Sequence, residues 1–255
     1  MIDWAELTLF LYILARMCGC VLFNPILGRQ NIPAIVKTGM ALLMAVAVMG
    51  VTGQSVAVPF STLELALRMA LELGVGVLLG MAMNFFFYIP SLAGSVIDTQ
   101  MGMTMNQIYD AGSQANLSVS GVLLNTLMTL LFFAANGHHT LLRIIMTSGE
   151  VVPFGHAALG EAVLRHMLTL FIECTLLAVK LCMPILAAEL LGQIGMGILM
   201  KVIPQINVFA INIELKVIIG IGLLLMLLSP FSEFLLKAET QMLDSLRVIL
   251  GLAAG

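Results

Sequence analysis

Long runs of apolar residues, separated by short polar stretches, cover most of the 255-residue chain. Each run is long enough, or nearly so, for a helix that crosses a bilayer, which needs about 20 mostly apolar residues. Prolines fall in the breaks, where a residue without an amide donor ends or kinks a helix. The pattern predicts an all-α membrane-associated protein of helical hairpins with kinked helices. The predicted spans are Leu7–Leu27, Thr38–Val51, Leu63–Ile89, Leu117–Ala135, Met167–Leu191 and Ile206–Ser229.

A polar segment at residues 91–116 interrupts this pattern between two strongly apolar runs. It combines small residues, amides and two aspartates with several methionines. Polar backbone at membrane depth is tolerated only where it is buried in protein or lines a wet cavity. The segment is therefore either an aqueous loop or a re-entrant element beside a pore.

Two later segments also depart from the pattern. Residues 190–205 contain three glycines before Pro204, which predicts a tight or broken junction between two helices. Residues 231–250 mix charges with leucines at helical spacing. They predict an amphipathic tail helix that lies at an interface or on a partner.

Composition narrows the class of protein further. The chain is 60% hydrophobic and 10% charged, with a mean hydropathy of +1.08, whereas a soluble domain is about 25% charged. Its net charge of −3 includes no basic stripe, so we expect no nucleic-acid binding. No repeat or soluble domain stands out, and residues 1–255 are treated as a single subunit.

Several ionisable residues lie within the apolar runs, where each costs about 2.5–3.5 kcal/mol on insertion scales. Arg68 and Glu72 are four residues apart and can pair, and Glu173 and Lys180 share a helix face. Individually they fit ion pairs or snorkelling ends; together they favour a chain packed against partner helices. The charges expected at helix packing sites are Arg16, Arg68, Glu72, Glu173, Lys180, Glu189 and Glu214.

Small residues add to this picture, because the spacing Gly76-x-x-x-Gly80 lets helix backbones approach closely. The usual signatures of catalysis are missing: His138 and His139 are adjacent without an HExxH motif, and no GxSxG or Walker A sequence occurs. We predict no catalytic residues, no metal, no cofactor and no enzymatic activity.

The sequence Gly94-Ser-Val-Ile-Asp98-Thr-Gln100-Met101-Gly102, followed by Asp110 and Gly137-His138-His139, resembles the FliR/SctT family of type III secretion export-gate proteins. The resemblance covers nearly the whole chain in order. It departs from the family pattern at Ala111, Asn212 and Glu214. Further matching positions are Arg16, Gly19, Pro25, Pro33 and Lys37 near the start, and residues 183–187 and 204–209 near the end.

This resemblance implies one subunit of a helical, pore-forming hetero-oligomer in the bacterial inner membrane, at the flagellar basal body. Its implied partners are FliP-like and FliQ-like gate subunits, an FlhB-like switch protein, unfolded flagellar export substrates and membrane lipid. The assembly would stand partly above the bilayer plane. Approximately, residues 1–165 would be a FliP-like part with the pore loop 91–116, and residues 166–255 a FliQ-like hairpin with a C-terminal helix.

The implied mechanism is passive conduction of unfolded protein through a closable pore, with the loop after Gly102 as the plug. Methionine suits a seal because its unbranched thioether is apolar and adaptable. Alternatively, Met101, Met103 and Met105 pack the loop against neighbouring subunits. The expected pore-loop residues are Gln100, Met101, Gly102, Met103, Met105, Asn106, Gln107, Ile108, Tyr109 and Asp110.

Three alternatives stay open. Within the family, the chain could serve a virulence secretion system instead of a flagellum. A small-solute transporter would use Arg68, Glu72, Glu173 and Lys180 as a midplane site. An intramembrane enzyme would use His138 and Asp98, without an evident metal or nucleophile.

Overall fold

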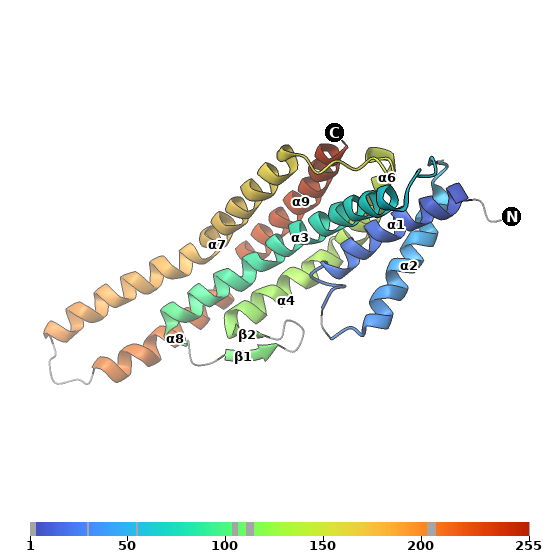
Figure 1. Cartoon of the computed structure of the whole chain (residues 1–255). Helices are drawn as coiled ribbons and strands as arrows, with labels where there is room; N and C mark the ends of the chain where they lie inside the picture. Colours follow the sequence, from blue (N-terminus) through green and yellow to red (C-terminus); the bar gives the residue numbers. More distant parts are fainter. Residues whose placement is uncertain are drawn as a thin grey trace. The chain divides into compact units, whose positions relative to one another are not determined.

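The computed structural model of the chain is built almost entirely from helices (Figure 1). It describes residues 4–29, 31–54, 56–103, 107–110, 115–202 and 208–254. The described helices are α1 Trp4–Leu22, α2 Ala34–Val51, α3 Thr62–Met101, α4 Val119–Ala134, α5 Gly137–Met146, α6 Ser148–Val151, α7 Glu161–Val202, α8 Val208–Met226 and α9 Leu228–Ala253. The described strands are β1 Gln107–Asp110 and β2 Ala115–Ser118.

Helix length and composition confirm the predicted class, an all-α membrane protein. Four described helices, α1, α2, α3 and α7, are long and apolar enough to cross a membrane. The number rises to six if the bent pairs α4 with α5 and α8 with α9 each form one span. α2 buries only Ala41, Ala45 and Val48, which lie on one side of the helix, and exposes most of its other apolar side chains.

Two helices run further than the apolar runs predicted. α3 continues through Pro90 to Met101, so the end expected near Ile89 is wrong. α7 continues through Pro184 and the glycine-rich stretch to Val202, so the chain does not break at the three glycines; residues 203–205 of the expected junction lie outside the described residues. An interior proline removes one backbone hydrogen bond, a loss that membrane helices tolerate when neighbouring groups replace it.

The C-terminal helix α9 is amphipathic, as predicted. Its buried side chains recur every three or four residues and include Phe231, Leu235, Met242 and Leu246. These side chains are buried within the chain itself, so this stripe is not a surface for a separate partner; the predicted position of the helix at an interface or on a partner stays a prediction.

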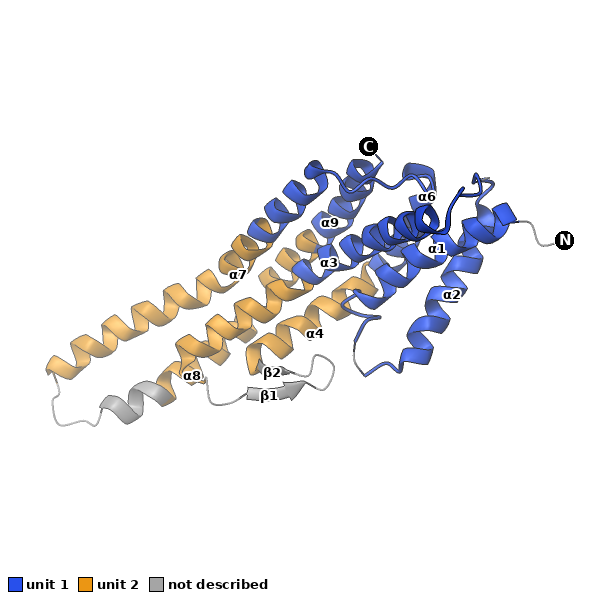
Figure 2. Cartoon of the chain, viewed as in Figure 1, with its two compact units in different colours: residues 1–86, 136–172, 239–255 blue, residues 87–135, 173–238 orange. Residues whose placement is uncertain are grey.

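The described residues form two compact units (Figure 2). Unit 1 comprises residues 1–86, 136–172 and 239–255; unit 2 comprises residues 87–135 and 173–238. Each unit joins segments that are distant in the sequence, and α3, α7 and α9 contribute to both. The expected division near residue 165 concerns likeness to other subunits and stays a prediction.

Within unit 1, α1 and α3 approach each other through glycines. A side-chain carbon at Gly76 would overlap the carbonyl oxygen of Arg16 and lie 2.8 Å from the backbone nitrogen of Cys20. At Gly80 it would lie 2.8 Å from the carbonyl carbon of Phe23. The prediction that Gly76-x-x-x-Gly80 permits close backbone approach is confirmed, and the approach is made within the chain.

We predict that Gly76→Ala lowers the free energy of unfolding by about 1–3 kcal/mol, because the new methyl group would force the two backbones apart. The measurement is unfolding of the purified protein in mild detergent. Gly39→Ala is the matched control in the same unit: nothing lies within 4 Å of a side-chain carbon there. This control should leave stability unchanged or raise it by up to about 1 kcal/mol. Equal losses in both variants would contradict the packing argument.

Candidate functional site

The polar segment between α3 and α4 begins with a defined helix end. Gly102 has φ +77°, a left-handed conformation that glycine adopts without strain. The Gly102 N–H donates to the Thr99 carbonyl at 3.2 Å, and the Met103 N–H donates to the Asp98 carbonyl at 2.8 Å. These two hydrogen bonds define a Schellman motif, which terminates α3 at a fixed residue.

The structure places Gln100 and Met101 in the last turn of α3 rather than in the loop predicted for them. Met101 is fully buried. A side-chain carbon at Gly220 of α8 would lie 2.6 Å from the Met101 Cγ, so this methionine packs directly on a glycine of unit 2. Met103, beyond the helix end, is half-buried. A role for these residues in a pore stays a prediction.

Beyond Met103, the chain forms a two-stranded antiparallel hairpin that was not predicted. β1 comprises the expected pore-loop residues 107–110, and it pairs with β2 so that Gln107 lies opposite Ser118 and Asp110 opposite Ala115. The other expected residues, Met105 and Asn106, lie outside the described residues.

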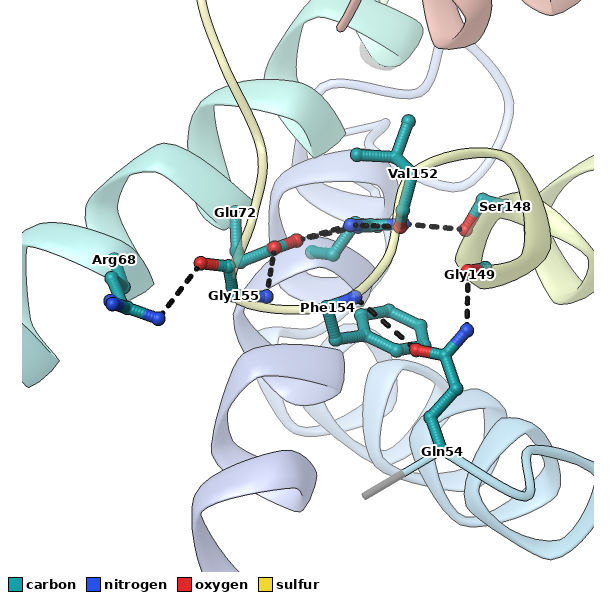
Figure 3. A network of polar contacts seen from close by, with 9 residues as sticks. Gln54, Arg68, Glu72, Ser148, Gly149, Val152, Phe154 and Gly155 are labelled. Atoms are coloured by element: carbon teal, nitrogen blue, oxygen red, sulfur yellow. Dashed lines mark hydrogen bonds and ion pairs between the residues drawn. The ribbon is translucent and has the colours of Figure 1, made fainter. Parts of the chain in front are cut away.

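A buried ion pair joins α1 to α3 in unit 1 (Figure 3). The side chains of Arg16 and Glu72 are both 0% exposed; Oε2 of Glu72 lies 2.6 Å from Nη2 and 2.7 Å from Nε of Arg16. The guanidinium also donates to the Ser148 hydroxyl at 3.2 Å and the Val152 carbonyl at 3.0 Å. It lies 4.3 Å from the ring centroid of Phe154, a cation–π contact. Arg16 thus holds the segment that follows α5.

Gln54 binds the same segment from the connection between α2 and α3 (Figure 3). Its Nε2 donates to the Gly149 carbonyl at 2.6 Å, and its Oε1 accepts from the Phe154 N–H at 3.3 Å. An isolated glutamine in a polar stretch carries no sequence signal for this role, and it was not predicted.

Arg68 and Glu72 do not pair with each other, which corrects the pairing inferred from their spacing. Arg68 instead contacts Glu64 at 2.7 Å, and both side chains are 31% exposed. Its Nη1 also donates to the Gly155 carbonyl at 3.3 Å. Glu72 uses Oε1 to accept from the Gly155 N–H at 2.8 Å. Arg16 of α1 lies within ion-pair distance of Glu72, whereas Arg68 lies one turn nearer the start of α3, beside Glu64.

The remaining predicted charges divide by exposure. Glu189 is 1% exposed, as expected for a buried charge. Glu173, Lys180 and Glu214 are exposed on the single chain, and their expected place at helix packing sites stays a prediction. Among the described residues, no group of three His, Cys, Asp or Glu side chains is placed to hold a metal ion.

Apolar helices of membrane-spanning length, an ion pair buried between them and a polar hairpin after α3 define a helical membrane protein. Its polar groups hold segments of chain together. The chain belongs to the family described as "Bacterial export proteins, family 1", whose profile matches residues 7–242.

Curated relatives agree with this assignment over most of their length. The chain is 29% identical to the flagellar biosynthetic protein FliR of Escherichia coli (strain K12), covering 82% of this chain and 80% of that protein. It is 27% identical to FliR of Bacillus subtilis (strain 168), covering 82% and 81%. It is 24% identical to Yop proteins translocation protein T of Yersinia pestis, covering 80% and 79%.

We predict that Glu72→Gln lowers the free energy of unfolding by about 3–5 kcal/mol, because it leaves the guanidinium of Arg16 buried without a counter-charge. Unfolding of the protein in mild detergent measures the change. Glu161→Gln is the matched control: the Glu161–Arg165 pair also spans 2.7 Å, but its side chains are 83% and 77% exposed. The control should cost less than about 1 kcal/mol. Similar losses at both positions would show that burial does not decide the effect.

Proposed function

We propose that the chain is a subunit of the flagellar type III protein export gate and lies in the bacterial inner membrane at the flagellar basal body. The observation that carries this proposal is the match to flagellar FliR proteins across about four fifths of both chains, 82% and 80% for the Escherichia coli protein. The membrane-length helices agree with such a location.

The gate subunits proposed as partners are FliP-like and FliQ-like proteins, together with an FlhB-like switch protein and membrane lipid. Residues 1–165 would correspond to a FliP-like part and residues 166–255 to a FliQ-like hairpin with its C-terminal helix. The exposed face of α7 supports assembly, because it carries Glu173 and Lys180 among exposed apolar side chains. Charges facing hydrocarbon are costly, whereas a protein partner or water accommodates them.

The proposed activity is passive conduction of unfolded flagellar subunits through a pore that the polar segment closes. The segment has the required chemistry: it leaves an apolar helix, forms a small hairpin and carries methionines, whose thioethers adapt to varied surfaces. No catalytic group takes part in this mechanism.

A virulence secretion system is the second candidate, since the chain is also 24% identical to the Yersinia pestis protein and 27% identical to the apparatus protein SsaT of Salmonella typhimurium, the latter over 58% of this chain. Complementation separates the two systems. A flagellar subunit should restore swimming to a strain that lacks its own FliR and should leave secretion by a virulence system that lacks its SctT protein unrestored.

We predict that a tag on this chain co-purifies FliP-like and FliQ-like subunits from mild detergent, with one copy of this chain in each assembly. The measurement is native mass spectrometry of the purified material, which identifies and counts every component. Untagged cells provide the background. A stable lone monomer or homodimer would instead favour the hypothesis that the chain is a small-solute transporter.

We predict that deletion of residues 106–116 makes the assembled gate leak ions, because the segment that closes the pore would be missing. The measurement is loss of membrane potential in cells that express the variant, reported by a voltage-sensitive dye. Co-purification of the other gate subunits with the deletion variant is the necessary control. If cells with the assembled variant keep the same membrane potential as cells with the intact gate, closure of the pore by this segment is contradicted.

A further inference from the structure

Asp98, one turn before the end of α3, binds the beginning of α4. Its side chain is almost completely buried at 2% exposure. The Ser120 hydroxyl donates to Oδ1 of Asp98, and the Ser120 N–H donates to the two carboxylate oxygens at 3.4 and 3.3 Å. The first N–H groups of a helix have no partner within it, and negative charge is favoured there. The Asp98 carboxylate therefore completes the N-terminus of α4.

The same residue also closes α3. Its carbonyl oxygen accepts the Met103 N–H in the Schellman motif, so the backbone of Asp98 fixes where the polar segment begins. Its side chain fixes where that segment returns to helix. Asp98 thus forms hydrogen bonds at both ends of the polar segment, where it leaves α3 and where it enters α4.

Close packing keeps the two helices in register at this point. A side-chain carbon at Gly94, one turn before Asp98, would overlap the backbone of Gly121. The two backbones are therefore in direct contact next to the hydrogen bonds. This contact holds Asp98 within reach of Ser120.

The hairpin is continuous with this contact. β2 ends at Ser118 and α4 begins at Val119, so no linker separates them. The Ser118 side chain caps α4 by accepting the Gly121 N–H at 3.1 Å, and Ser118 lies opposite Gln107 in the strand pairing. An isolated two-stranded hairpin is marginally stable. The order of β1 and β2 therefore depends on the contact between Asp98 and Ser120, which we call the root of the hairpin.

We propose that Asp98 is the positioning residue of the hairpin: its contact with Ser120 holds β1 and β2 at the end of α3, and breaking that contact frees the hairpin to move. The first half of this inference stands on the geometry of unit 2 alone. The second half, that a freed hairpin opens the pore, rests on the proposed function.

The test uses the co-purified gate assembly and measures amide hydrogen exchange by mass spectrometry in peptides that cover residues 107–118. Asp98→Ala should speed exchange there by about tenfold or more, because it removes hydrogen bonds to a charged acceptor. Ser120→Ala, a milder change that keeps the backbone N–H, should raise exchange in the same peptides by a smaller factor. If the Asp98→Ala variant does not assemble, Ser120→Ala alone tests the positioning role.

Ser91→Ala is the matched control. It removes the hydrogen bond from Asn125 Nδ2 to the Ser91 hydroxyl, 2.9 Å long, which also joins α3 to α4 but lies two turns from the root. Exchange at residues 107–118 should stay as in the unmodified gate. Unchanged exchange in both root variants, or an equal rise in Ser91→Ala, would overturn the positioning role.

Membrane potential in the same strains separates the two halves of the inference. Leakage with Asp98→Ala and with the 106–116 deletion, but not with Ser91→Ala, supports opening by release of the root. Leakage with the deletion alone, while Asp98→Ala speeds exchange, overturns opening by release and leaves the proposed function intact. No leakage in either variant overturns pore closure by this segment, whereas the exchange result still decides the positioning role.

Discussion

The ion pair between Arg16 and Glu72 organises unit 1. Two charges that are 0% exposed are tolerated only if their remaining donors and acceptors are also satisfied. Arg16 meets this requirement through Ser148 and Val152, and Glu72 meets it through the Gly155 N–H. The chain between α5 and α7 must therefore follow the path that supplies these groups. That path is a consequence of burying the pair.

α3 carries two buried carboxylates that work in the same way, one in each unit. Glu72 accepts the N–H of Gly155, and Asp98 accepts the N–H of Ser120. In lipid, the hydrophobic effect no longer drives helices together, so polar contacts and small residues take over. Close approach at glycine accompanies both contacts, at Gly76 and at Gly94. The few polar side chains of the long apolar helices thus fix where distant segments attach.

The sequence predicted the helical class from its apolar runs. It also singled out the ionisable residues within those runs, because charges are costly in the hydrocarbon of a bilayer. It did not predict the partner of Glu72, since spacing along one helix reveals Arg68 but not a residue on another helix. It also did not predict the hairpin. Ile108 and Tyr109 favour strands, and Gly112 and Ser113 favour a turn, but the polar composition of the segment favoured an irregular loop.

The lengths of α3 and α7 limit how the protein can sit in a membrane. With 40 and 42 residues, they extend about 60 Å at 1.5 Å per residue, roughly twice the 30 Å of a hydrocarbon core. At ordinary tilts, part of each helix must lie outside the hydrocarbon, against water or other proteins. The exposed charges Glu173 and Lys180 of α7 are costly inside the core and acceptable outside it. Helix length and exposed charge thus both favour an arrangement in which part of α7 lies beyond the hydrocarbon.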